Sequence, residues 1–330
     1  MSSDPSEISN IFIAYFLDGW GVRAPNPHLE GGAMDPVIVL FGLGVGVLIG
    51  LTGVGGGSLM TPLLILVLGV KPTLAIGTDL AYGAVTKTLG AWRHLRLGNV
   101  DLRLSWWLGL GSIPGSLLGV SLIDWLHQTG PADVDAIMLR ALAVTLMMVS
   151  VSMVVGAPHS YPVEPTLDGR GKLWAVSIGL AVGIVLGLTS VGSGALIGLA
   201  LIVVFRLGPR RVVGTDVFHA AVLLWVAGLA HWKLGHVDFR LMGNMLLGSL
   251  PGVWLGSGAT EKIHSLTLRL TMAMVLLASG LGLTAKSGWN VPPLAILGVP
   301  AVLGLALHRR QKLVRCKEFS FERSCPAESE

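Results

Sequence analysis

The chain has 330 residues, of which 52% are hydrophobic and only 13% are charged, and its formal net charge is +4. Soluble domains carry about 25% charged residues, so this composition excludes an ordinary soluble protein of this length. Together with a mean hydropathy of +0.72, it indicates an all-α, multi-pass membrane protein. The basic residues lie in short loops and one tail, and we expect no nucleic-acid partner. The 45 glycines need an explanation, because glycine costs about 1 kcal/mol in a helix interior.

Apolar blocks alternate with polar loops along the chain. In chain order, we predict helices over residues 36–51, 59–70, 73–92, 104–123, 136–156, 173–188, 195–207, 212–230, 241–258, 266–284 and 291–307. A membrane core of about 30 Å requires about 20 helical residues. The blocks on either side of two Gly-rich runs, 52–58 and 189–194, are shorter than that, so we expect broken or re-entrant helices there.

The two ends of the chain lie outside these blocks. We predict that residues 1–35 form an interfacial or flexible segment and that residues 308–330 form a basic tail. We expect no cleavable signal peptide, because the apolar run 11–17 is short and no Lys or Arg precedes it. Cys316 and Cys325 lie close together in the polar tail, which indicates neither a disulfide scaffold nor a metal site. Their role stays open.

The two halves of the chain are copies of each other. Residues 48–119 align with residues 185–256 at an offset of 137 positions without a gap, and 30 of the 72 aligned positions are identical. The repeat predicts two transmembrane units, each with one Gly-broken helix pair and three spans, separated by a polar loop and followed by one extra helix. In chain order, these parts occupy residues 36–156, 157–172, 173–284 and 285–307.

The charges of the loops orient the units. Lys and Arg residues cluster in the tail, and the positive-inside rule places such a tail in the cytoplasm. Counting helices backwards from it makes the loop 206–211 cytoplasmic and the loop 231–240 external. If each broken pair returns to the side it entered, the Arg-containing loop 93–103 is cytoplasmic and the Asp-rich loop 124–135 is external. Because a single crossing would put those arginines outside, we predict inverted repeats.

Inverted repeats with Gly-interrupted helices are typical of secondary transporters, whose substrates bind near the midplane where the breaks meet. The helix after each break points free N–H groups and a positive dipole end at the break, which favours an anion. The candidate substrate-binding residues are Thr52, Gly55, Gly56, Gly57, Ser58, Thr189, Ser190, Gly192, Ser193 and Gly194. Close helix packing through small residues is the alternative, and we favour it for scattered glycines such as Gly109 and Gly111.

Few ionisable residues lie inside the predicted spans. Asp79 and Asp216 follow Gly-Thr at matching positions, and an intramembrane carboxylate is a functional hypothesis by default. Both are candidates for proton coupling, with helix capping through the neighbouring Thr as the alternative. Lys87, whose counterpart is Leu224, is a candidate counter-charge for the substrate or Asp79, unless it snorkels to the interface. His219 is a further candidate for proton handling, because an unperturbed histidine titrates near neutral pH, although a lone helical histidine is more often packed and hydrogen-bonded.

The loops carry matching His and Asp residues, His94 with Asp101 and His231 with Asp238. Their positions predict turn capping and hydrogen bonds at helix ends, and their spacing is a weak metal signal. We therefore expect no metal site. The chain has no Walker sequence, and we expect no nucleotide or other cofactor.

The assembled motifs resemble the TauE/SafE family of membrane transporters. The resemblance lies in residues 50–62 (GLTGVGGGSLMTP), 75–79 (AIGTD), 98–101 (GNVD) and 112–119 (SIPGSLLG), with second-half echoes at 187–196, 213–216, 235–238 and 249–256. It covers about residues 37–283. It implies export of sulfite, sulfoacetate or related sulfur-containing anions across a bacterial inner membrane. The second half departs from the pattern, since Ser190 and Ser193 replace glycines and Leu199 stands where Pro62 does, which points to an asymmetry between the halves.

The leading hypothesis is a secondary active transporter that exports a small anion, a sulfur oxyanion or organosulfonate, by alternating access of the inverted repeats, and protons are a candidate coupling ion. A passive anion channel built from the same parts is the alternative. A membrane enzyme is disfavoured, because no catalytic dyad, Ser/His pair or HExxH motif occurs within one span. The sequence leaves open the substrate, the coupling ion, the direction of transport, the oligomeric state and whether the Gly-broken segments span the membrane or re-enter.

Overall fold

The structure, a computed structural model, describes residues 35–52, 56–129, 133–155, 168–192, 194–260 and 265–288, with a few positions between 292 and 300. Every regular element in the ranges up to residue 288 is an α-helix, which confirms the predicted all-α class. In chain order the helices are α2 (Pro36–Thr52), α3 (Gly57–Leu66), α4 (Pro72–Arg96), α5 (Leu102–Thr129), α6 (Val134–Val155), α7 (Gly169–Thr189), α8 (Ala195–Val203), α9 (Pro209–Lys233), α10 (Phe239–Thr260) and α11 (Ser265–Lys286). The predicted N-terminal segment, most of the central loop and of the last helix, and the tail with Cys316 and Cys325 lie outside the described residues.

The helix breaks fall where the glycines predict them, between α2 and α3 and between α7 and α8. The second helix of each pair is shorter than predicted. Gly69 and Arg206, which occupy matching positions after these helices, have positive φ angles of 66° and 50°, a conformation that ends a helix. Pro72 and Pro209 then open α4 and α9, where the first turn does not need the missing N–H.

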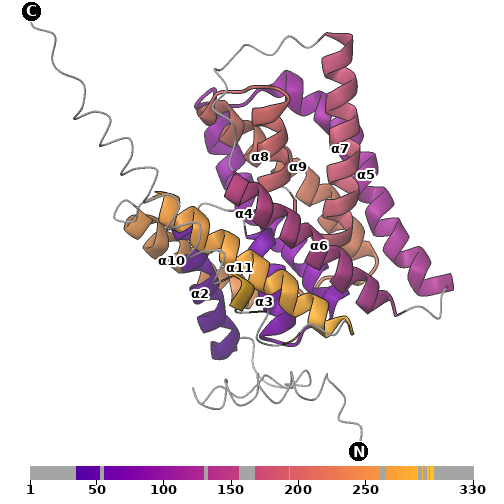
Figure 1. The fold of residues 1–330 in the computed structure, drawn as a ribbon, viewed down its shortest axis with the longest axis vertical. Coiled ribbons are helices and arrows are strands. Elements are labelled where there is room, and N and C mark those ends of the chain that lie inside the picture. Colours follow the sequence, from indigo (N-terminus) through magenta and orange to yellow (C-terminus); the bar gives the residue numbers. More distant parts are fainter. Residues whose placement is uncertain are drawn as a thin grey trace, which may run out of the picture.

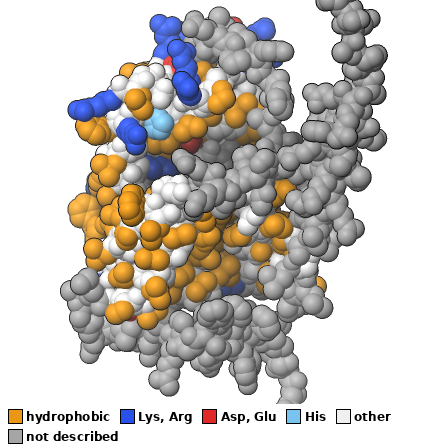
Figure 2. Space-filling view, turned by 90° about the vertical axis from the view of Figure 1, so that its left-hand side faces the viewer, with side chains coloured by type: hydrophobic (Ala, Val, Ile, Leu, Met, Phe, Trp, Pro, Cys, Tyr) orange, Lys and Arg blue, Asp and Glu red, His pale blue; other side chains and the backbone are white. Residues whose placement is uncertain are grey.

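Much of the outer surface is apolar. Within the described residues, α5, α6, α7 and α9 are long and apolar enough to cross a membrane. Large hydrophobic side chains point outwards, for example Trp254 with 77% of its surface exposed and Leu40 with 69%. Figure 2 shows hydrophobic side chains over much of one face, with Lys and Arg gathered at its upper end. A surface of this kind agrees with a multi-pass protein in contact with lipid.

Helices of one half of the chain pack on helices of the other half. At the repeat offset α2 corresponds to α7, and α5 corresponds to α10. Figure 1 shows α2 beside α10 and α7 beside α5, so the first helix of each half packs on the fourth helix of the other. The next largest contacts join α4 to α9 and α6 to α11, which are also equivalent elements. The halves therefore interlock reciprocally instead of standing as separate bodies.

Rows of glycines at every fourth position bring the backbones of α2 and α10, and of α5 and α7, into contact. A Cβ atom at any of these glycines would come within 2.9 Å of backbone atoms of the neighbouring helix. The rows are Gly42, Gly46 and Gly50 on α2; Gly248, Gly252 and Gly256 on α10; Gly111, Gly115 and Gly119 on α5; and Gly179, Gly183 and Gly187 on α7. This is small-residue packing of membrane helices. It confirms the prediction for Gly111, whereas Gly109 faces open space and its predicted packing role is wrong.

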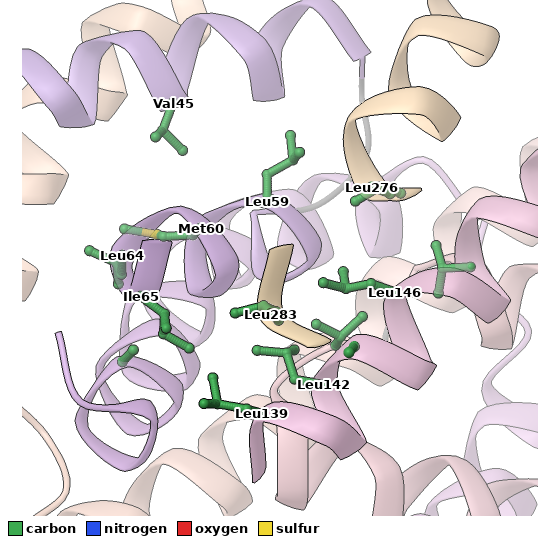
Figure 3. Packing of buried hydrophobic residues seen from close by; sticks show 14 of the residues in the cluster. Val45, Leu59, Met60, Leu64, Ile65, Leu139, Leu142, Leu146, Leu276 and Leu283 are labelled. Carbon is green, nitrogen blue, oxygen red and sulfur yellow. The ribbon is translucent and has the colours of Figure 1, made fainter. Parts of the chain in front are cut away.

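The short helix α3 lies inside the protein. Leu59, Met60, Leu64 and Ile65 of α3 are fully buried, and Figure 3 shows them in one hydrophobic cluster with leucines of α6 and α11, among them Leu142. Broken backbone at membrane depth is tolerated only where protein or a water-filled cavity surrounds it. The packing of α3 thus encloses the helix that follows the first break.

The Gly-Thr-Asp segments bind the loops of the opposite half. The backbone N–H of Asp238 donates to Thr78 Oγ1 at 3.0 Å, and at matching positions the N–H of Asp101 donates to Thr215 Oγ1 at 2.9 Å. The two loop aspartates accept hydrogen bonds from amides in the first turns of α10 and α5. The predicted capping role of these aspartates is confirmed. The threonines contact the other half of the chain, which makes Gly-Thr-Asp a contact motif between halves.

We expect Thr78→Val to destabilise the protein by about 1–3 kcal/mol, because the Asp238 N–H then loses its acceptor in a partly buried position. Thr215→Val should have a similar effect through Asp101. Thr86→Val is the matched control on α4, since the Thr86 hydroxyl only donates to carbonyls of its own helix. Thermal unfolding in detergent measures all three variants. Equal losses for Thr78 and Thr86 would contradict this role.

Candidate functional site

The two helix breaks meet between the halves. Gly57, at the start of α3, lies against Ser190, at the end of α7: a Cβ atom at Gly57 would be 2.8 Å from the Ser190 carbonyl oxygen. The same position would be 3.5 Å from Asp79 Oδ2 on α4. At the equivalent place in the second half, a Cβ atom at Gly194 would be 3.9 Å from Asp216 Oδ2 on α9. Each carboxylate therefore faces the break of its own half, as the repeat requires.

Asp79 is held by two hydroxyl groups. Its Oδ2 accepts a hydrogen bond from Thr61 Oγ1 at 2.6 Å and another from Ser190 Oγ at 2.5 Å. The two hydroxyl oxygens lie 2.8 Å apart. All three side chains are almost completely buried. Because Thr61 and Asp79 belong to the first half and Ser190 to the second, this cluster joins the two broken helix pairs.

The backbone of Ser190 adopts a conformation that usually belongs to glycine. Its φ of 59° and ψ of −10° lie in the left-handed region, where it caps the C-terminus of α7. A residue with a Cβ atom costs about 1–2 kcal/mol there, and the equivalent residue of the first half is Gly53. Such strain concentrates at functional sites. The hydroxyl that Ser190 presents to Asp79 offers a physical reason for a serine at this position.

Lys87 is a positive charge that acts on both carboxylates. It lies two helical turns after Asp79 on α4, is half-buried, and interacts electrostatically with both Asp216 and Asp79. Asp216 is also buried, with 9% of its surface exposed. In each aspartate the Oδ1 atom has no hydrogen-bond partner in the described part of the chain. The site thus combines two buried carboxylates, one lysine and the start of α3 beside the end of α7.

His219 belongs to a different contact. Its Nε2 atom lies 3.1 Å from Ser112 Oγ on α5, and its ring also hydrogen-bonds the backbone of Ser105. Its repeat counterpart Tyr82 donates to Ser249 Oγ on α10 at 2.8 Å. The two equivalent contacts join the halves of the chain. They fit the alternative of a packed, hydrogen-bonded histidine at position 219.

The remaining candidates are distributed unevenly. The Thr189 hydroxyl donates to the Val185 carbonyl oxygen of its own helix at 2.7 Å, and Gly192 has a φ of 129° that favours glycine. Gly56 lies beside the Tyr82 ring, and Ser58 is buried at the start of α3. Thr52 ends α2, while Gly55 and Ser193 lie outside the described residues.

Thr61 was missed by the sequence reasoning. Its repeat counterpart is Gly198, so a search for polar residues shared by both halves passes over it. The signal was its place in the GLTGVGGGSLMTP segment, one turn after the Gly-rich run.

Comparison with known proteins identifies the family of this chain. The profile of the family described as "Sulfite exporter TauE/SafE" matches residues 38–283. The chain belongs to the TauE/SafE family. No solved structure matches the chain.

The curated relatives of this TauE/SafE chain are named as membrane transporters. "Probable membrane transporter protein YjnA" of Bacillus subtilis is 39% identical over 257 residues, which are 76% of this chain and all of that protein. "Probable membrane transporter protein YdhB" of the same organism is 26% identical over 74% of this chain and 97% of its own length. "Probable membrane transporter protein MJ0441" of Methanocaldococcus jannaschii is 24% identical over 74% of this chain and 94% of its own length. With the apolar helices, these likenesses establish a multi-pass membrane protein of a transporter family.

A histidine cluster lies at one end of the TauE/SafE bundle, outside the candidate site. His231 Nδ1 is 3.2 Å from His236 Nδ1, and the His127 and His236 rings are 6.3 Å apart. Within the described residues, no group of three or more His, Cys, Asp and Glu side chains could hold a metal ion. Burial, and secondly the neighbouring His127, lowers the pKa of His236 in the loop before α10, while Asp124 acts in the opposite direction.

This shift predicts lower stability in mild acid. Because the folded protein protonates His236 at a lower pH than the unfolded chain does, the unfolded chain binds more protons as the pH falls below about 6.5. The contribution of His236 is therefore present above that pH and is lost below it. His236→Asn, which installs the residue of the equivalent position 99, should flatten the decline in melting temperature between neutral and mildly acidic buffer. Parallel declines in both proteins would contradict the assignment.

Proposed function

We propose that this chain is a secondary active transporter of a small anion, a sulfur oxyanion or organosulfonate, with protons as the coupling ion; the net direction of transport follows the combined gradients of anion and proton. The observation that carries the proposal is the meeting of the two breaks beside Lys87 and two buried carboxylates. The family description names sulfite export, and this supports the choice of substrate class.

Local charge supports an anionic substrate that binds together with a proton. The start of α3 carries the partial positive charge of a helix N-terminus, and Gly57 lets the end of α7 at Ser190 approach it closely. Lys87 adds one full positive charge. Asp79 and Asp216 would repel an anion if both were ionised, and an uncompensated buried charge costs several kcal/mol. Protonation of a carboxylate removes this repulsion, so anion and proton binding favour each other.

Contacts at one end of the helix bundle define a common level. There the His127 ring of α5 lies near His236 in the loop between α9 and α10. At the start of α6, Arg140 Nη2 donates to the Ser287 carbonyl oxygen just after α11 at 3.2 Å. Since α5 leads directly into α6, these two contacts lie at the same end of the bundle.

Both ends of the first broken pair lie at that level, which supports re-entry. The Asp35 N–H, just before α2, donates to Asn244 Oδ1 near the start of α10. Lys286 Nζ, at the end of α11, donates to the Ile65 carbonyl oxygen near the end of α3. A chain that enters and leaves at one end forms a hairpin. With the reciprocal packing of the halves, this favours inverted repeats that rock against each other for alternating access.

The same orientation argument favours an external position for the loop between α9 and α10 and a cytoplasmic C-terminus. By family likeness and the basic loops, we assign the protein to the bacterial inner membrane.

A substrate panel in proteoliposomes tests the function. Purified protein should transport at least one of sulfite, thiosulfate, sulfoacetate and taurine faster than protein-free liposomes do, with a rate that saturates with concentration. A rate that rises linearly to high concentration would favour the passive channel. No flux of any of these compounds would contradict the proposed substrate class.

A further inference from the structure

We propose that the two equivalent aspartates have different roles: Asp79 is a fixed hydrogen-bond acceptor that fastens the two broken helix pairs together, and Asp216 is the carboxylate that takes up the proton, which releases Lys87 to the anion. This inference rests on the proposed function, because it assigns the coupling at that same site. It breaks the symmetry that the repeated Gly-Thr-Asp segment suggests.

Two hydroxyl hydrogen bonds favour the ionised form of Asp79. Two hydroxyl hydrogens converge on Oδ2, from Thr61 and from Ser190. Hydrogen bonds to an ionised carboxylate are worth about 1.5–3 kcal/mol each, and both would weaken if the carboxylate became neutral. Ser190 also keeps a left-handed backbone conformation while its hydroxyl makes this contact. A group held in this way by both halves is suited to be a structural acceptor.

The surroundings of Asp216 lack these hydroxyls. The positions equivalent to Thr61 and Ser190 are Gly198 and Gly53, neither of which has a side chain to donate a hydrogen bond. Asp216 Oδ1 is buried and has no hydrogen-bond partner in the described residues. Asp79 Oδ1 also lacks a partner there, but two hydroxyls donate to the other oxygen of Asp79, so Asp216 is the carboxylate that gains more from accepting a proton.

The charged groups near Asp216 are also distributed asymmetrically. Lys87 of α4 is the charged group that acts on Asp216, whereas its repeat counterpart is the buried, neutral Leu224. His219, one turn further along α9, is hydrogen-bonded to Ser112. Of the two carboxylates that interact with Lys87, Asp79 is therefore already held by hydroxyls and Asp216 is not.

In the proposed step the negative charge of the anion replaces that of Asp216, so the net charge of the site is conserved. In the empty site the negative charge of Asp216 opposes the positive charge of Lys87. A proton moves onto Asp216 Oδ1, the carboxyl becomes neutral, and a monovalent anion takes its place beside Lys87. The sum of the three charges is unchanged, one proton accompanies each monoanion, and no covalent bond other than the O–H bond forms.

Asp216→Asn and Asp79→Asn separate the two roles. The probe is methanesulfonate, which stays a monoanion in mildly acidic and neutral buffers. In wild-type proteoliposomes an imposed pH gradient should stimulate its flux severalfold. In Asp216→Asn we expect the stimulation ratio to fall to about one. In Asp79→Asn, and in its matched variant Thr61→Val, we expect a lower melting temperature but a stimulation ratio above one. Gly109→Ala should keep the wild-type stimulation ratio without a lower melting temperature, because position 109 faces open space.

A second measurement does not require transport. In infrared spectra of purified protein, the C=O band of a protonated carboxyl should grow as the pH falls, persist in Asp79→Asn and disappear in Asp216→Asn. The opposite pattern, with the band lost in Asp79→Asn and kept in Asp216→Asn, would overturn the division of roles. If no anion is transported but the band follows Asp216, the proposed function fails while the assignment of the proton stands.

Discussion

Gly111→Ala should separate α5 from α7 and leave little folded protein, while Gly109→Ala, two positions away on the same helix, should be tolerated. A Cβ atom at position 111 would overlap the Val176 carbonyl oxygen and lie 2.8 Å from Leu180 N. Both are backbone atoms, so no side-chain rotation relieves the contact. Overpacking by even one methyl group costs about 1–3 kcal/mol, and we expect a loss at the upper end of that range or above it.

The control isolates packing from helix propensity. Position 109 is open, and alanine is favoured over glycine there by about 1 kcal/mol, so its melting temperature should stay or rise. On α2 the same contrast holds between Gly46→Ala, which meets the Ser249 backbone, and Gly44→Ala, which meets nothing within 4 Å. Thermal unfolding in detergent, followed by tryptophan fluorescence, measures all four variants. Similar melting temperatures within each pair would show that the helices are not in backbone contact.

Lys87→Leu should reduce anion flux by about 100-fold or more. The substitution installs the residue found at the equivalent position 224 and removes the one full positive charge that we assign to the anion. Loss of one partner from a buried ion pair costs about 3–5 kcal/mol, and each 1.4 kcal/mol corresponds to a factor of ten. Lys87→Arg, which keeps the charge, should retain measurable flux. Initial rates in proteoliposomes at equal protein content give the comparison.

A double variant separates binding from folding. Lys87→Leu alone leaves Asp216 without its opposite charge, so part of its effect comes from a less stable protein. Lys87→Leu combined with Asp216→Asn removes both charges and should recover the melting temperature without recovering flux. If flux returns with stability, Lys87 is a structural partner of Asp216, and the anion binds elsewhere.

Much of the scaffold follows from local signals in the sequence. The glycines at 52–58 and 189–194 identify both helix breaks, and the 137-residue offset matches the first four helices of one half to the first four helices of the other. The loop aspartates Asp101 and Asp238 cap helices as their positions indicate. These features depend on residues near in sequence, where backbone preferences and capping act.

The contacts between halves could not be predicted in the same way. The four-residue spacing of glycines reveals a flat helix face, but it does not say that α2 faces α10 instead of α7. Likewise, nothing near Thr61 in sequence indicates that its hydroxyl shares Asp79 Oδ2 with Ser190, 129 residues away. The role of His219 stayed open in the sequence for the same reason. Its hydrogen-bond partner, Ser112, lies on another helix. Such pairings arise from the packing of the whole chain.

Uphill transport tests the central claim most directly. Proteoliposomes with equal concentrations of a transported sulfur anion on both sides receive a pH gradient, and the anion content of the lumen is followed over time. Coupling through the site of Asp79, Asp216 and Lys87 predicts that the anion moves against its own concentration gradient in the direction of the protons, and that the movement stops when a protonophore removes the gradient. An anion that stays at equal concentrations while the pH gradient persists would contradict a proton-coupled transporter.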